Sequence, residues 1–188
     1  MKELLYKTLK EISDPEVKGF VCTALDHAPE QFWTDPCSGS GKYHPPEDQG
    51  LGGIVRHLVK GAVIASELCR YYNLTVQDRD IVVAATILHD IKKNGEPWGS
   101  KTTIDHGLTA YNWLGQFALK NPDKDEIRDC VRYHMGQWAE PEVERARALK
   151  PTLNESIVQL TDYFTSRKYA SFLPGINLSE EQIRNYTR

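Results

Sequence analysis

The chain of 188 residues carries a formal charge of -3, with 40% hydrophobic and 26% charged residues. This composition is typical of a globular chain long enough for one buried core, so we expect a single domain over 1–188. The near balance of charge argues against a long nucleic acid as the partner, and no apolar run approaches the roughly 20 residues of a membrane span.

The N-terminal sequence and the cysteine pattern both indicate the compartment of the protein. The N-terminus has no long apolar run, so no signal peptide is expected. Four scattered cysteines without a CxxC pair are typical of reduced thiols. We therefore expect a cytoplasmic protein.

The N-terminal part predicts two helices followed by a long loop. Apolar residues at helical spacing lie within 2–12, and Asp14-Pro15 has the chemistry of a helix cap and first helical residue. These helices, within 1–27, are expected to pack on the core. Residues 28–50 are rich in proline, glycine and aromatic residues and predict one long loop.

The helical pattern resumes at Gly52-Gly53 and continues to the end of the chain. Residues 94–101 have turn chemistry, and no strand pattern is present. The sequence therefore predicts an all-α helical bundle with its core at about 43–168. The expected helices cover 53–72, 78–90, 103–119, 123–134, 141–144 and 154–167, with a short terminal helix within 179–188 that opens on a capping box at 179–182.

The centre of the chain holds an apolar helix that ends on two polar residues. The run from Ala84 to Leu88 is almost wholly apolar and is followed by His89 and Asp90. Burying this pair costs several kcal/mol unless a partner satisfies it. A divalent metal ion is the partner that satisfies the pair at the lowest cost in free energy. The alternative is that Asp90 caps a helix or forms a salt bridge and that His89 is a hydrogen-bonded core histidine.

Residues of the same kind recur on successive predicted helices. Each of them alone is typical of an ordinary core or capping residue, but a series that converges on a bundle core is how helical bundles build metal sites. Mixed imidazole and carboxylate ligands suit Mn, Fe, Co, Ni or Zn. The candidate ligands are His57, His89, Asp90, His106, His134 and Asp162.

The order His … His-Asp … His … His … Asp resembles the HD-domain superfamily of metal-dependent phosphohydrolases over about 43–168. Residues 52–57, Gly-Gly-Ile-Val-Arg-His, are similar to the GGL-x-x-H motif of several branches. Residues 88–93, Leu-His-Asp-Ile-Lys-Lys, are similar to the LHD-hydrophobic-x-K core. The segments 131–134 and 160–163 are similar to the later histidine and the closing aspartate.

The resemblance implies one or two divalent transition-metal ions. One ion would be held by His57, His89, Asp90 and Asp162. The second would be held by His106 and His134, with Asp90 bridging the two. Met135 stands where some two-metal members have another histidine, which leaves the second ion fewer protein ligands.

The implied activity is hydrolysis of a phosphate ester or anhydride, most simply of a nucleotide-like small molecule, by metal-activated water. Asp90 and Lys93 are the predicted catalytic residues, with Lys93 meeting the charge that develops on the phosphoryl group. Further predicted substrate contacts are Arg56, Lys60, Lys101 and Arg132 for phosphate, and Tyr43, His44 and Trp98 for a base or ribose. Their ordinary alternatives are surface charges and packing of the long loop.

Three other functions stay open at this stage. Relatives with the same ligand order, such as inositol-cleaving oxygenases, use two irons to activate oxygen. A non-catalytic, metal-stabilised nucleotide-binding domain is a second alternative, and an exonuclease acting on single strands is a third. The sequence leaves open which phosphoester is cut and whether the chain forms homo-oligomers.

Overall fold

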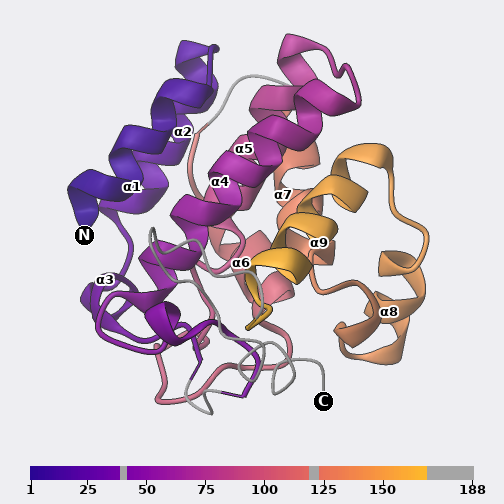
Figure 1. Cartoon of the computed structure of the whole chain (residues 1–188). Coiled ribbons are helices and arrows are strands. Elements are labelled where there is room, and N and C mark those ends of the chain that lie inside the picture. The colour runs from indigo at the N-terminus through magenta and orange to yellow at the C-terminus, as the bar shows by residue number, and fades with distance from the viewer. Residues whose placement is uncertain (39–41, 119–122, 169–188) are drawn as a thin grey trace, which may run out of the picture.

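The computed structural model describes residues 1–38, 42–118 and 123–168, and within these ranges the chain is helical, without a strand (Figure 1). The all-α prediction is therefore confirmed. The α-helices are α1 (Lys2–Thr8), α2 (Pro15–Asp26), α3 (Glu30–Thr34), α4 (Gly53–Tyr71), α5 (Val76–Leu88), α6 (His106–Leu114), α7 (Asp123–Tyr133), α8 (Glu142–Ala148) and α9 (Leu153–Thr165). Short 3-10 helices cover Leu9–Glu11, Pro46–Asp48 and Gly136–Trp138.

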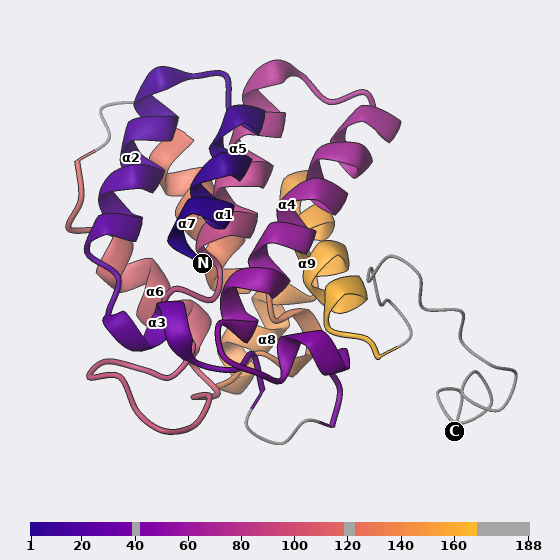
Figure 2. The same cartoon turned by 60° about the vertical axis from the view of Figure 1, so that its left-hand side comes forward.

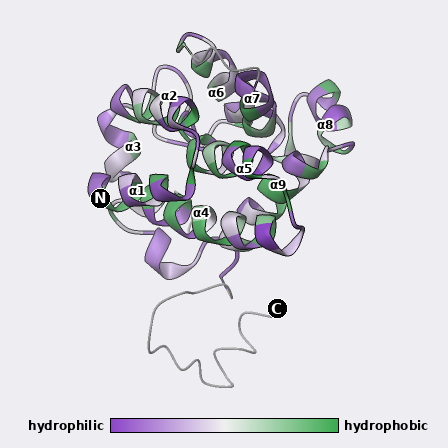
Figure 3. Ribbon diagram, turned by 90° about the horizontal axis from the view of Figure 1, so that it is seen from above, coloured by the Kyte–Doolittle hydropathy of each residue, from purple (hydrophilic) through white to green (hydrophobic). Residues whose placement is uncertain are grey.

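Helix α5 is the centre of the bundle. It packs against α2, α4, α7 and α9, and Figure 3 shows it surrounded by α4, α7 and α9 when the molecule is viewed from above. Every residue from 80 to 95 is buried, including the turns that follow the helix. An apolar helix with no polar face requires such an environment, because each of its sides must leave water. The His89-Asp90 pair therefore lies inside the protein.

The two N-terminal helices cover one side of this core. Helix α1 packs on α4 and α2 packs on α5, as Figure 2 shows from the side. The side chain of Asp14 accepts hydrogen bonds from the first turn of α2, and Pro15 is its first residue, as predicted. The buried carboxylate of Asp80 on α5 accepts from the backbone amides of Ser13 and Asp14. This contact fixes the start of α2 against the central helix.

The prediction of a plain loop over 28–50 is wrong in part. This segment contains α3 and the 3-10 helix Pro46–Asp48. Phe32 and Trp33 on α3 are buried, and their rings meet edge to face with centroids 4.9 Å apart. Burial of these two rings stabilises a helical turn that the local proline and glycine content disfavours.

The loop is held close to the start of α4 by a glycine. A Cβ atom on Gly53 would lie 1.9 Å from the carbonyl oxygen of Asp48 and 2.6 Å from the amide nitrogen of Cys37. Only a residue without a side chain permits this approach. Cys37 and His44 of this loop both lie buried, with Cys37 near Lys93 and the ring of His44 against that of His57 on α4.

Other boundaries differ by a few residues from the predicted ones. Helix α6 ends at Leu114, short of the predicted end at 119, which itself lies outside the described residues. Helix α8 is longer than the predicted segment 141–144. The predicted capping box at 179–182 also lies outside the described residues, whereas Thr152 and Glu155 form one at the start of α9. None of the helices in the described ranges has the length and apolar character to cross a membrane.

Candidate metal centre

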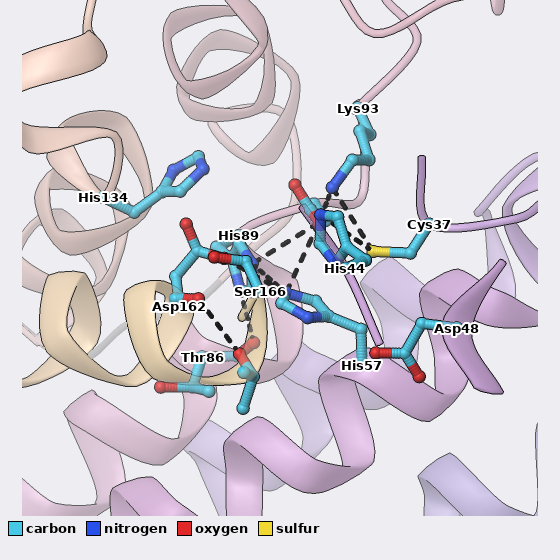
Figure 4. Close-up of polar contacts among 12 residues, drawn as sticks. Cys37, His44, Asp48, His57, Thr86, His89, Lys93, His134, Asp162 and Ser166 are labelled. Carbon is cyan, nitrogen blue, oxygen red and sulfur yellow. Dashed lines mark hydrogen bonds and ion pairs between the residues drawn. The ribbon is translucent and has the colours of Figure 1, made fainter. Parts of the chain in front are cut away.

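Six side chains from five helical segments meet at the C-terminal end of α5. His57 lies on α4, His89 and Asp90 follow α5, His106 is the first residue of α6, His134 follows α7, and Asp162 lies on α9. The side chains of the four histidines and Asp90 are at most 3% exposed, and that of Asp162 is 23% exposed. Figure 4 shows His57, His89, His134 and Asp162 at this junction.

Three of the histidines are oriented in the same way. Nδ1 of His89, His106 and His134 lies 2.7–2.8 Å from the backbone carbonyl oxygen three residues earlier, which belongs to Thr86, Thr103 and Val131. A carbonyl oxygen only accepts, so Nδ1 carries the proton and donates it. Nε2 of each ring is then directed into the cluster and offers a lone pair there whenever the ring is neutral, which is how metal-binding histidines are held.

These nitrogens are close together. Nε2 of His106 lies 3.0 Å from Nε2 of His134, and Nε2 of His57 lies 3.2 Å from Nε2 of His89. Two lone pairs at such a distance repel each other unless a positive charge lies between them. Two nitrogens that are each about 2.1 Å from a shared ion, at a right angle, are about 3.0 Å apart. The donor set and its spacing therefore fit a divalent cation.

The four histidines form two pairs, His57 with His89 and His106 with His134. The carboxylate of Asp90 lies between these two groups. Its Oδ2 atom is 3.5 Å from Nε2 of His89 and 3.8 Å from Nε2 of His57. Its Oδ1 atom is 3.4 Å from Nε2 of His106 on the other side. Asp162 completes the first group, since its Oδ1 lies 3.1 Å from Nε2 of His57. Asp90 is thus placed to join two adjoining cation positions.

Both carboxylates are ionised. Burial raises the pKa of Asp90, but the charges of Lys93 and His89 outweigh this effect and hold the pKa well below its usual range. The pKa of Asp162 is also well below its usual range, because hydrogen bonds from His57 and His89 outweigh its burial. Two buried negative charges require positive partners.

Without a metal ion, a histidine takes up a proton to meet this requirement. Burial lowers the pKa of His89, but Asp90 and Asp162 outweigh it and raise the pKa to about 10. His134 behaves in the opposite way, because burial and the neighbouring His89 and His106 lower its pKa to about 3. The centre therefore holds a proton where a cation would provide the positive charge.

Lys93 is the positive partner that the protein itself provides. Its Nζ donates to Oδ2 of Asp90 at 2.6 Å and lies 3.5 Å from Sγ of Cys37. Burial lowers the pKa of Lys93, but Asp90 outweighs it and raises the pKa above its ordinary value, so the ammonium stays charged. Burial raises the pKa of Cys37 despite Lys93, so Cys37 is a neutral thiol.

The long loop adds two further buried groups next to His57. The ring of His44 lies edge to face with that of His57, with centroids 5.1 Å apart, and burial lowers the pKa of His44 to about 2. On the other side, Asp48 lies near His57 (Figure 4), and burial raises its pKa. Three buried atoms here have no hydrogen-bond partner among the residues that the structure describes, namely Nδ1 of His44, Nδ1 of His57 and Oδ1 of Asp48.

A cavity of about 400 Å³ opens onto the cluster. Its lining includes four of the six clustered side chains, namely Asp90, His106, His134 and Asp162. Among the predicted catalytic and substrate-binding residues, Lys93, Tyr43 and His44 also line it. A cavity of this size suits a small-molecule ligand.

The other predicted substrate contacts lie elsewhere, and each has a different partner. Arg56 donates to the carbonyl oxygens of Glu47, Gly50 and Leu51. Lys60 pairs with Asp48 at 2.6 Å, and Arg132 forms a two-pronged ion pair with Glu144.

Lys101 and Trp98 are also outside the cavity lining. Lys101 is exposed and lines a separate hollow formed largely by residues 94–101. Trp98 donates its Nε1–H to Asp35 and packs edge to face on Phe32. Trp98 therefore packs the long loop, and the structure brings none of these five residues to the cavity.

Among the cavity residues that were not predicted from the sequence, four have an aromatic ring, a thiol or a charged group. They are Cys37, Trp138, Tyr163 and Arg167. A signal was present for two of them, because Tyr163 and Arg167 are one helical turn apart and flank the end of the helix that carries Asp162. Nothing in the local sequence marks Cys37 or Trp138.

The family comparison agrees with this geometry. The family model for the HD domain matches residues 54–167, more than half of the chain. The chain belongs to the HD domain family, and the resemblance is confirmed. Neither the curated proteins nor the solved structures provide a match. The family is one of metal-dependent hydrolases, and the buried histidine and aspartate groups are compatible with its metal site.

Proposed function

We propose that the protein is a metal-dependent phosphohydrolase that cleaves a phosphate ester or anhydride of a nucleotide-like small molecule. The single observation that carries this proposal is the position of Asp90. Its two oxygens face different histidine groups, Lys93 lies beside it, and a cavity opens above it. Two adjoining cation positions with one bridging carboxylate and a nearby ammonium suit an in-line displacement at phosphorus.

Each of the six clustered residues has a role in holding the ions. His57, His89 and Asp162 would hold one ion, His106 and His134 would hold the other, and Asp90 would join them. Ions bound there would lower the pKa of a water molecule to about 7 and offset phosphoryl charge. The backbone carbonyls behind His89, His106 and His134 hold the Nδ1 proton of each ring and aim its Nε2 inwards, at the side that an ion would meet.

Lys93 stabilises the negative charge that grows on the phosphoryl oxygens. Its ammonium lines the cavity, is fixed by Asp90 and stays protonated. A fixed cation in a buried site is worth more than the same cation in water, because no solvent has to reorganise around it. This placement supports phosphoryl transfer more than chemistry that develops no anionic charge.

The test is a screen of the reloaded protein. After chelation, the protein is loaded in turn with Mn, Fe, Co, Ni and Zn and offered nucleotides, cyclic nucleotides, dinucleoside polyphosphates and generic phosphodiesters, with metal analysis alongside. We expect product release with at least one metal. Asp90→Ala should lose both metal and activity, whereas Asp125→Asn, at an exposed carboxylate on α7, should keep both.

The same reloaded protein distinguishes the proposed hydrolase from an oxygenase and from a non-catalytic domain. Iron-loaded protein that consumes oxygen but releases no phosphate would instead be an oxygenase. Full metal content and full turnover in Asp90→Ala would refute the site assignment. Metal-loaded protein that binds nucleotides without turnover on any of these substrates would be a non-catalytic domain.

A further inference from the structure

One wall of the cavity is built from two aromatic rings and an arginine. Trp138 ends the 3-10 helix Gly136–Trp138, Tyr163 follows Asp162 on α9, and Arg167 lies just beyond α9. The rings of Trp138 and Tyr163 are inclined by only 13°, with centroids 5.9 Å apart. We refer to Trp138, Tyr163 and Arg167 as the aromatic–arginine wall.

The guanidinium of Arg167 is fixed but not neutralised. Its central carbon lies 3.9 Å from the centroid of the Tyr163 ring and 5.6 Å from that of Trp138. Its Nε atom is buried and has no hydrogen-bond partner within 1–38, 42–118 and 123–168. Among the described residues no carboxylate forms an ion pair with it, in contrast to Arg132 and Lys60. An arginine held over an aromatic ring interacts with the ring through its charge and keeps hydrogen-bond donors for other partners.

The ring of Trp138 offers an open surface next to this cation. Trp138 is 49% exposed and Tyr163 is 37% exposed, and both line the same cavity as the clustered histidines. A large aromatic side chain left half open beside a functional cavity is a stacking platform for a planar group. The wall therefore combines a site for an anion with a site for a flat ring.

We propose that the aromatic–arginine wall is a specificity subsite that binds the base and a phosphate oxygen of a nucleoside phosphate. The guanidinium of Arg167 donates to the phosphate, and the base stacks on the exposed part of the Trp138 ring. This proposal rests on the proposed function for the reacting end of the ligand, and it assigns to these residues the selection of nucleoside phosphates over simple sugar phosphates. Tyr163 is the positioning residue, because its ring holds the guanidinium at 3.9 Å.

The experiment measures binding without turnover. The metal-loaded protein is titrated calorimetrically with the 5′-methylenephosphonates of the four ribonucleosides, whose carbon linkage resists hydrolysis, and with the matching ribose phosphonate without a base. We expect at least one nucleoside phosphonate to bind roughly tenfold more tightly than the ribose compound, as base stacking implies.

Two variants test separately how much the base contact and the phosphate contact contribute to the binding affinity. Trp138→Leu keeps an apolar side chain but removes the aromatic face, so it should abolish the preference for the nucleoside compound. Arg167→Gln should weaken both compounds roughly tenfold or more, because a charged hydrogen bond is lost. Arg128→Gln is the matched control, since Arg128 also lies 3.9 Å from a tyrosine ring but is on α7, outside the cavity.

Equal affinity for the nucleoside and ribose compounds in the unaltered protein would overturn the base subsite. Unchanged affinity in a folded Arg167→Gln variant would overturn the role of the arginine. A preference that disappears in Trp138→Leu supports the subsite even if every hydrolysis assay fails, so the two proposals are tested separately. Trp138→Phe, which retains a ring, should keep most of the preference.

Discussion

Lys93 and Asp90 form the pair of charges nearest to the proposed reaction. We expect Lys93→Met to lower kcat by about 100-fold, because a fixed cation no longer meets the developing phosphoryl charge. Metal content should stay the same or rise, since the substitution removes a positive charge next to the ions. Steady-state kinetics and metal analysis of the same preparation measure both effects.

The neighbouring lysine provides the control for this prediction. Lys92 is also buried, but its ammonium lies over the ring of Trp113 and does not line the cavity. Lys92→Met should leave kcat within about twofold of the unaltered protein. An unchanged rate in Lys93→Met would remove Lys93 from the reaction.

The proton on His89 links metal binding to pH. In the metal-free protein the pKa of His89 is raised to about 10, so at pH 7–8 its ring carries a proton that a metal ion must displace. Metal affinity should therefore rise with pH towards the raised pKa and fall as pH is lowered. Calorimetric titration in buffers of different ionisation enthalpy should show that protons are released on binding. Binding without proton release would contradict the protonated state of His89.

At the scale of elements, the contact between the long loop and α4 depends on Gly53. Gly53→Ala should lower the free energy of unfolding by about 2 kcal/mol or more, because its Cβ atom would lie 1.9 Å from the carbonyl oxygen of Asp48. The loop must move, and with it Cys37 and His44. Chemical denaturation measures the loss in stability.

Gly19 on α2 provides the matched control, because no described residue outside its own helical turn comes within 4 Å of the Cβ position there. Gly19→Ala should raise the free energy of unfolding by roughly 0.5–1 kcal/mol, as expected for alanine in a helix interior. Equal effects of the two substitutions would show that the close approach at Gly53 is unimportant for stability.

At the scale of the whole molecule, metal ions should act as cross-links between helices. The clustered residues come from α4, α9 and the ends of α5, α6 and α7, which are far apart in sequence. An ion that binds only the folded chain adds roughly 2.7 kcal/mol of stability at 100 times its Kd. We therefore expect a rise in Tm of about 5–10 °C on loading, measured by differential scanning calorimetry.

Histidine substitutions show whether this stabilisation comes from the centre. His57→Gln should abolish most of the rise in Tm. His27→Gln should preserve it, because His27 is exposed at the end of α2 and lies outside the cluster. A full rise in Tm in His57→Gln would place the stabilising ion elsewhere.

The fold and the six clustered residues could be predicted because both follow from local signals. Helical periodicity placed α4, α5, α7 and α9 within a few residues, and the family pattern gave the order of the ligands. The short helix α3 was missed because its stability comes from burying Phe32 and Trp33, which is a tertiary effect.

The predicted phosphate contacts illustrate what local sequence signals do not predict. An arginine or lysine near a motif has no preferred partner until the chain folds. Arg56 turns to the carbonyls of its own loop, and Arg132 meets Glu144. Arg167 differs from them because its Nε–H has no acceptor in the part of the chain that the structure describes. Sequence patterns do not encode that absence.

The unbroken burial of residues 80–95 has a kinetic consequence. Amide hydrogens in this stretch are shielded on all sides, so they should exchange with deuterium only when the entire molecule opens. The turn that bears His89 and Asp90 would then be among the slowest-exchanging parts of the protein, unlike the mobile loops that carry many active sites. Heat or denaturant should therefore disrupt the cluster of histidines and aspartates and melt the core in one event, without a stage in which the core survives and the cluster is lost.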